Sequence, residues 1–88
     1  MGKQRDILCD MGFEESVVFE NPDFEEAIIG VTDNGSVVYD YDLMVKTLME
    51  EDNITAEDAV EFIDYNTLRS IPYAPDPKPI VMYPLWEI

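Results

Sequence analysis

AIIGVTDNGSVVY, residues 27–39, is the stretch that decides the fold, because two β-forming runs flank an Asn34-Gly35 pair. Asn-Gly suits the two central positions of a type I′ turn, whose twist matches that of paired antiparallel strands. The segment therefore predicts a β-hairpin with a two-residue loop. That loop places Gly30 opposite Tyr39, so that the tyrosine covers the backbone that glycine leaves bare.

Two amphipathic helices are expected after the hairpin. The first has its apolar stripe within residues 41–49 and ends near residues 52–53, with Asp40 or Asp42 as the N-cap whose carboxylate accepts from the first free amides. The second begins at Thr55 in a sequence that resembles a capping box. Leu68 falls out of phase with the apolar face of this second helix. Either the helix loosens there or Leu68 packs on a second surface.

The two ends of the chain complete the order of elements. Residues 1–12 are expected to form an N-terminal helix or arm, and residues 16–20 a short first strand. A proline-rich connection, residues 72–79, is expected to be extended rather than helical, because four of its residues are proline. Residues 80–83 are expected to form a last strand, which Pro84 ends.

This order of elements predicts an α+β fold, a small two-layer sandwich of three to four strands. The antiparallel hairpin and the C-terminal strand pack against the two helices. At 88 residues the chain has room for one hydrophobic core, so residues 1–88 are expected to be a single acidic domain. The single cysteine and the lack of a bilayer-length apolar run predict a cytoplasmic protein without a membrane partner.

The charge balance is extreme, since 20 Asp and Glu face 5 Lys and Arg, with no His, for a formal net charge of −15. A negative field repels phosphate backbones, because nucleic-acid binding depends on cations that displace condensed counterions. Direct binding of nucleic acid is therefore not expected. The same field attracts basic protein surfaces and speeds encounter with them. Solubility alone is the other explanation for such a surface.

Many of the carboxylates concentrate in residues 50–64. They are Glu50, Glu51, Asp52, Glu57, Asp58, Glu61 and Asp64. Like charges one helical turn apart cost roughly a few tenths of a kcal/mol each, so helix stability does not explain them. The cluster predicts an acidic binding face that occupies a cationic groove in place of a phosphate backbone, whereas a solvated helix face is the plain alternative. Arg69, close behind the cluster, is expected to reach Tyr65 or a carboxylate of the chain.

A second candidate surface is aromatic. Tyr73, Tyr83 and Trp86 accompany the C-terminal strand, and Tyr and Trp are enriched at the hot spots of protein interfaces. These rings could instead cap the open side of the sheet. A homodimer formed through the edge of that strand would satisfy both interpretations.

The patterns that carry catalytic or metal chemistry are weak. Without His, a catalytic triad or a proton shuttle near neutral pH must rely on other groups, and the scattered glycines form no phosphate-binding loop. Neither residues 33–35 nor residues 40–42 have the ligand spacing of an EF-hand, and a lone cysteine cannot provide a zinc cluster. The sequence therefore predicts no enzyme, no metal site and no cofactor.

Three strings carry a resemblance to a known family: NPDFEEAIIGVTDNGSVVYDYD (21–42), EDAVEFIDYNTLRSIPY (57–73) and PIVMY (79–83). Together they resemble a family of short, acidic, uncharacterised proteins of Gram-positive bacteria and their phages, over residues 20–84. The resemblance implies a cytoplasmic accessory protein encoded by a bacterium or a phage. That family has no assigned activity, so no site residue is implied by it.

The sequence supports two hypotheses of function. The first is a non-catalytic acidic binding protein, phage- or prophage-encoded, whose partner is another protein with a basic surface. It would inhibit a basic nucleic-acid-handling protein, for example a bacterial defence effector, by charge mimicry. The alternative is a structural or assembly module that self-associates through its C-terminal strand, with the acidity serving solubility only.

Overall fold

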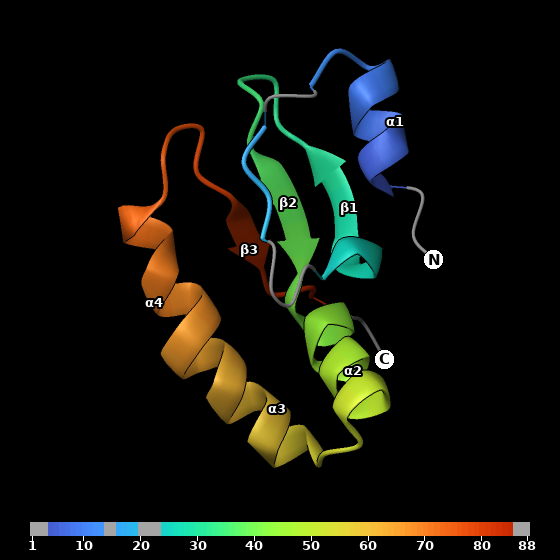
Figure 1. Ribbon diagram of the computed structural model, residues 1–88, viewed down its shortest axis with the longest axis vertical. Helices are drawn as coiled ribbons and strands as arrows, with labels where there is room; N and C mark the ends of the chain where they lie inside the picture. The colour runs from blue at the N-terminus through green and yellow to red at the C-terminus, as the bar shows by residue number, and fades with distance from the viewer. Residues whose placement is uncertain (1–3, 14–15, 20–23, 86–88) are drawn as a thin grey trace.

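The hairpin is present in the computed structural model of the chain, which describes residues 4–13, 16–19 and 24–85 (Figure 1). Its two strands, β1 (Ile28–Val31) and β2 (Val37–Asp40), pair antiparallel. The third strand runs on the other side of β2, so the order across the sheet is β1-β2-β3. The α+β fold predicted from the sequence is therefore confirmed.

The third strand, β3 (Ile80–Met82), is parallel to β2. Parallel neighbours need a crossover connection, and the helices that come after the hairpin supply it. Its place at the edge of the sheet agrees with the proline at residue 84, which removes a backbone donor just beyond the strand.

The turn of the hairpin differs from the predicted two-residue type I′ turn. Gly35 has a left-handed φ of 92°, whereas Asn34 does not have a positive φ, and the loop comprises residues 33–35. Thr32 closes this wider loop, because its amide donates to the Ser36 carbonyl at 2.8 Å. Its hydroxyl oxygen also accepts from the Ser36 amide at 3.0 Å. The threonine side chain, which the Asn-Gly rule ignores, favours the longer loop.

The wider loop changes the pairing of the strands. Gly30 lies opposite Val38 and not opposite Tyr39 as predicted, and an irregularity between Ile28 and Gly30 brings Ile28 opposite Tyr39. Gly30 is consequently exposed, and a side chain added there would meet nothing within 4 Å. Tyr39 instead packs under Phe19, with ring centroids 4.7 Å apart.

The strand expected over residues 16–20 is absent from residues 16–19, and residue 20 lies outside the described residues. This segment is held by side-chain hydrogen bonds rather than by a strand ladder. The Phe19 amide donates to the Tyr39 hydroxyl at 3.0 Å, and the Ser16 hydroxyl donates to the Gly35 carbonyl at 2.8 Å. The segment therefore contacts the hairpin at Gly35 and Tyr39 without joining the sheet.

The helix α2 (Tyr41–Asp52) begins directly at the end of β2. Of the two candidate caps, Asp40 is used, since its carboxylate accepts from the Leu43 amide at 3.1 Å. The helix ends at Asn53, which has a left-handed φ of 55°. Its buried residues are Tyr41, Met44 and Leu48.

The second helical run begins at Thr55, whose hydroxyl caps its first turn as predicted. It comprises α3 (Ala56–Phe62), a π-helical turn η2 (Ile63–Thr67), α4 (Leu68–Ser70) and a final 3-10 turn η3 (Ile71–Tyr73). A π turn holds an extra residue, which shifts the helical phase of the residues after it. The helix therefore loosens just before Leu68, and Leu68 is also half-buried against the core.

The proline-rich connection is shorter than predicted. Pro72 and Tyr73 belong to the 3-10 turn η3, so the non-helical connection begins at Ala74 rather than at residue 72. Proline is tolerated at the start of a helical turn because its missing N–H is not needed there. The Asp76–Pro77 peptide bond is cis.

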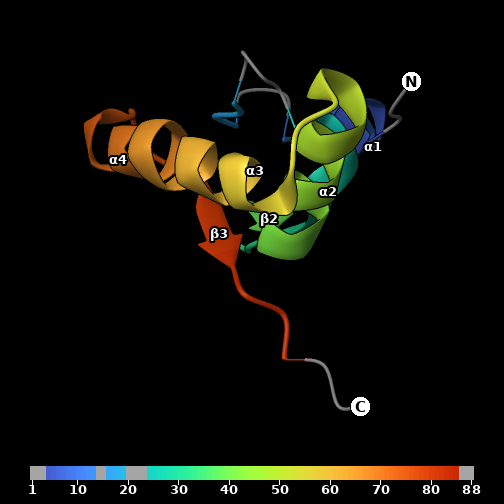
Figure 2. The same ribbon diagram turned by 90° about the horizontal axis from the view of Figure 1, so that it is seen from below.

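The layers are visible from two directions. The run from α3 to α4 lies on one side of the sheet, and the chain after β3 leaves on the other side (Figure 2). The N-terminal helix α1 (Gln4–Asp10) lies beside β1, and Gly12 comes after it with a left-handed φ of 90° (Figure 1). The largest fully buried side chains are Tyr39, Phe24, Met44, Leu48, Ile63 and Val37.

Candidate functional site

The predicted acidic residues lie at the end of α2, on α3 and in the π turn. All seven are exposed, and together they form the acidic face: Glu50, Glu51, Asp52, Glu57, Asp58, Glu61 and Asp64. Figure 1 shows that α2 ends and α3 begins at the same end of the molecule, which is the bottom of the view. The face therefore spans the junction of two helices and continues along the second.

The acidic face concentrates seven carboxylates on two neighbouring helices and the turn after them. Within residues 4–13, 16–19 and 24–85, no ion pair involves any of its carboxylates, and Lys78 pairs instead with Asp76 at 3.3 Å. Arg69, which follows the face in the sequence, lies over the ring of Tyr65, with 4.7 Å between its Cζ atom and the ring centroid. Of the two alternative contacts expected for Arg69, the one to Tyr65 is formed, and Arg69 has no ion pair among the described residues.

Asp64 differs from the other members of the face. Its Oδ1 atom accepts a hydrogen bond from the Tyr41 hydroxyl at 3.1 Å. Burial of the phenol, together with this hydrogen bond and the negative charge of Asp64, raises the pKa of Tyr41 to about 12. Asp64 thus connects the acidic face to the first turn of α2.

The predicted aromatic residues are placed separately. Tyr73 is 90% exposed at the end of η3, whereas Tyr83 comes just after β3 and packs against the ring of Tyr41, with centroids 4.7 Å apart. Among the described residues no ring contact joins Tyr73 to Tyr83, and Trp86 lies outside them. Sequence reasoning missed Tyr41 as the partner of Tyr83. The parallel register sets Asp40 beside Met82, and the residues that follow them, Tyr41 and Tyr83, are therefore neighbours. That register is not visible in the sequence.

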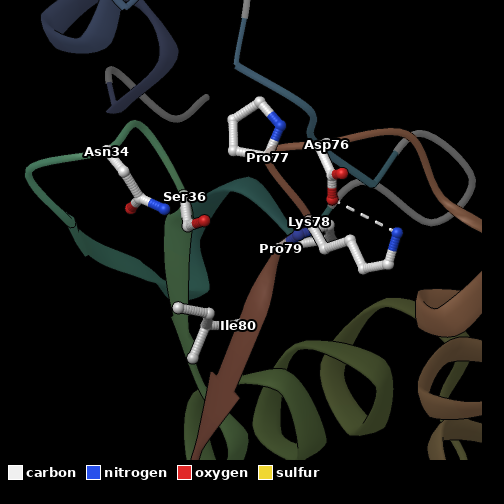
Figure 3. A pocket seen from close by; sticks show the side chains of 7 residues that line it. All are labelled: Asn34, Ser36, Asp76, Pro77, Lys78, Pro79 and Ile80. Atoms are coloured by element: carbon white, nitrogen blue, oxygen red, sulfur yellow. Dashed lines mark hydrogen bonds and ion pairs between the residues drawn. The ribbon is translucent and has the colours of Figure 1, made fainter.

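A hollow lies between the hairpin loop and the proline-rich connection (Figure 3). Its volume is about 530 Å³, and it is lined by Asn34, Ser36, Asp76, Pro77, Lys78, Pro79 and Ile80. The Lys78 ammonium is already held by the Asp76 carboxylate at 3.3 Å and donates to the Ala74 carbonyl at 2.7 Å. The lysine is thus engaged within the chain.

A second hollow, of about 390 Å³, separates α1 from β1. Its lining is mainly apolar, with Gln4, Ile7, Leu8 and Met11 from the helix side and Ile28, Ile29, Gly30 and Val31 from the strand. Ile7, Met11 and Ile29 are each at least half exposed there. Neither hollow contains residues of the acidic face.

The carboxylates, dense as they are, form no metal cluster in the described part of the chain. There, no three His, Cys, Asp or Glu side chains come together as metal ligands would. In the same residues, no helix combines the length and the apolar character needed to cross a membrane.

No protein-family model, no curated protein and no solved structure shows significant similarity to this chain. The resemblance to acidic proteins of Gram-positive bacteria and their phages therefore stays a prediction. Function is inferred from the chain's own residues.

Proposed function

We propose that the protein is a non-catalytic binding protein that docks its acidic face on the basic surface of another protein. The observation that supports this most is the group of seven exposed carboxylates, none of which has an ion-pair partner within the described residues. An unpaired charge retained on a folded surface is available to a partner of opposite sign, and it speeds the encounter.

The carboxylates are carried by rigid elements. Glu57 and Glu61 are one helical turn apart, or about 6 Å along the axis at 1.5 Å per residue. The Thr55 cap fixes the start of α3, and buried Ala59 holds the helix against the core. Because the helix sets the backbone positions of these charges, binding has to order only their side chains, which favours affinity.

A groove that normally holds a phosphate backbone is the basic surface such a face fits best. Arg and Lys side chains in that groove bind carboxylates by the same charge-assisted hydrogen bonds that they make to phosphates. The protein then acts as an inhibitor that keeps nucleic acid out. The family resemblance suggests a cytoplasmic accessory protein encoded by a bacterium or a phage, and a bacterial defence effector is one example of a nucleic-acid-handling target.

Two variants of equal net charge test this function. The acidic-face variant combines Glu51→Gln, Glu57→Gln and Glu61→Gln. The control variant combines Asp6→Asn, Asp10→Asn and Asp33→Asn, which are exposed residues outside the face. Each protein serves as bait in bacterial lysate at low and at moderate salt, and the nucleic-acid binding of any captured basic protein is then measured with bait added.

Wild type and the control variant are expected to capture the same basic protein and to displace nucleic acid from it. The acidic-face variant is expected to bind that protein about tenfold more weakly, since exposed charge pairs contribute roughly 0.2–1 kcal/mol each. Capture of no basic protein at either salt concentration would overturn the proposal. Equal losses in both variants would show that bulk charge, and not this face, governs binding.

Self-association through β3 is the alternative function. It is favoured by the position of β3 at the edge of the sheet and by the exposure of Ile80 and Leu85. Against it, Pro79 and Pro84 flank the strand and lack N–H donors, and the net charge of −15 repels a second copy. Sedimentation of wild type and of the Trp86→Ala variant distinguishes the two functions. A wild-type dimer that the substitution dissociates supports self-association, whereas a monomer in both proteins excludes it.

A further inference from the structure

Two tyrosines near the acidic face are equally exposed but differently surrounded. Tyr65 is 59% exposed and Tyr83 is 60% exposed. The guanidinium of Arg69 already lies over the ring of Tyr65 at 4.7 Å, which is the geometry of a cation–π contact. In the described residues no cation lies over Tyr83. Among the described residues, one ring therefore has a cation of the chain over it, and the other has none.

Tyr83 packs against the buried ring of Tyr41. Tyr41 is 9% exposed, and its ring lies 4.7 Å from that of Tyr83 at an angle of 45°. Tyr41 is fixed in turn by the hydrogen bond from its hydroxyl to Asp64 and by its place in the first turn of α2. An exposed ring supported in this way needs little further ordering when it binds a ligand.

Asp64 adds a negative charge beside the pair formed by Tyr41 and Tyr83. Its Oδ1 atom accepts from the Tyr41 hydroxyl, and no second partner holds the carboxylate among the residues that the structure describes. Tyr41 therefore contacts Tyr83 through its ring and Asp64 through its hydroxyl. An aromatic face and a carboxylate, both presented to solvent, are joined by one buried residue.

We propose that Tyr83 and Asp64, positioned by Tyr41, bind one arginine side chain of the basic partner. The inference rests on the proposed function, because the arginine belongs to the surface that the acidic face covers. A planar guanidinium stacks on an aromatic ring and bonds a carboxylate through two parallel N–H donors. A lysine ammonium is a compact and strongly hydrated charge, so it matches this pair less well.

The test uses three capped tripeptides, Gly-Arg-Gly and its lysine and citrulline counterparts, titrated into the isotope-labelled full chain. Tyrosine ring signals are monitored by NMR. The arginine peptide is expected to shift the Tyr83 and Tyr41 signals saturably and the Tyr65 signals much less. The lysine peptide is expected to bind more weakly. The citrulline peptide, which keeps the shape of arginine without its charge, is expected to give no saturable shift.

Variants locate the binding. Tyr83→Leu is expected to weaken the arginine peptide about two- to fivefold, the range of an exposed cation–π contact. Asp64→Asn keeps an oxygen for the Tyr41 hydroxyl but loses the charge, and about the same factor is expected. Tyr65→Leu is the matched control and is expected to leave the affinity unchanged. Dispersed amide spectra establish that each variant is folded.

Three results would overturn the arginine site. They are equal affinity for the arginine and citrulline peptides, equal shifts at Tyr65 and Tyr83, and unchanged affinity in both Tyr83→Leu and Asp64→Asn. The peptides need no partner protein, so this outcome is separate from that of the capture experiment. A partner that depends on Glu51, Glu57 and Glu61 without arginine selectivity would retain the proposed function and remove only this site.

Discussion

The helices α2 and α3 are neighbours joined by a short loop, yet they meet the rest of the molecule in different ways. α2 buries Tyr41, Met44 and Leu48, whereas α3 buries Ala59 alone and turns its carboxylates to solvent. A helix in a globular protein gains most of its stability from its packed apolar face. The hairpin with α2 is therefore expected to hold the fold, which leaves α3 free to carry charge.

The largest expected effect on stability comes from a substitution in the packed helix α2. Met44 is fully buried in α2, so Met44→Ala is expected to lower the free energy of unfolding by about 2–5 kcal/mol, through lost contacts and a cavity. Met49→Ala, on the same helix but 37% exposed, is the control and is expected to cost about 1 kcal/mol or less. Urea denaturation measures both, and equal losses would contradict the assignment of the core.

The two glycines of the hairpin are expected to respond in opposite directions. Gly35 has a φ of 92°, so Gly35→Ala is expected to cost about 1–2 kcal/mol of stability, because a Cβ atom disfavours left-handed backbone. Gly30 lies in a strand with open space around it, so Gly30→Val is expected to gain about 0.5–1 kcal/mol. Urea midpoints report both changes. A loss for Gly30→Val would contradict the register, and no loss for Gly35→Ala would contradict the loop.

Tyr41 connects the two regions, and its titration is expected to be visible in alkaline stability. Its pKa is raised from 10.0 to about 12, so between these values the unfolded chain loses the phenol proton while the folded chain keeps it. The folded form then binds more protons, and the free energy of unfolding falls as the pH rises from 10 to 12. Tyr41→Phe is expected to lose less stability over this interval than wild type. Identical pH slopes in urea unfolding would argue against the burial of Tyr41 and its contact with Asp64.

The smallest expected effect on stability comes from a substitution in the charged helix α3. Glu61 lies one turn from Glu57 with no ion-pair partner in the described residues, so Glu61→Gln relieves repulsion. A gain of about 0.2–0.5 kcal/mol in stability is expected from urea unfolding at low salt. Added salt is expected to reduce the gain, since it screens exposed charges. A marked loss of stability would instead show that Glu61 contributes to the fold.

Local features of the fold were predictable from the sequence. The caps at Asp40 and Thr55 depend on residues within one turn, and the hairpin depends on the run around Gly35. The loop type was missed because the Thr32 hydroxyl closes a longer loop than the Asn-Gly pair implies. Leu68 did signal a change of helical phase, which the π turn provides.

Features that depend on distant parts of the chain were not predictable in the same way. The exposure of the carboxylates is a consequence of their charge and was expected, but the hydrogen bond from Tyr41 to Asp64 joins two helices. The contact between Tyr41 and Tyr83 depends on the parallel pairing of β3 with β2, which no local pattern indicates. The acidic face was thus visible in the sequence, whereas the arginine site required the structure.

The acidic face, rather than net charge, is the feature proposed to bind a basic partner. The most direct measurement is the salt dependence of the association constant between the captured partner and each of wild type, the acidic-face variant and the control variant. Ion contacts at the interface set the slope of log association constant against log salt. We expect a shallower slope for the acidic-face variant and an unchanged slope for the control. Equal slopes for these two variants would contradict the claim.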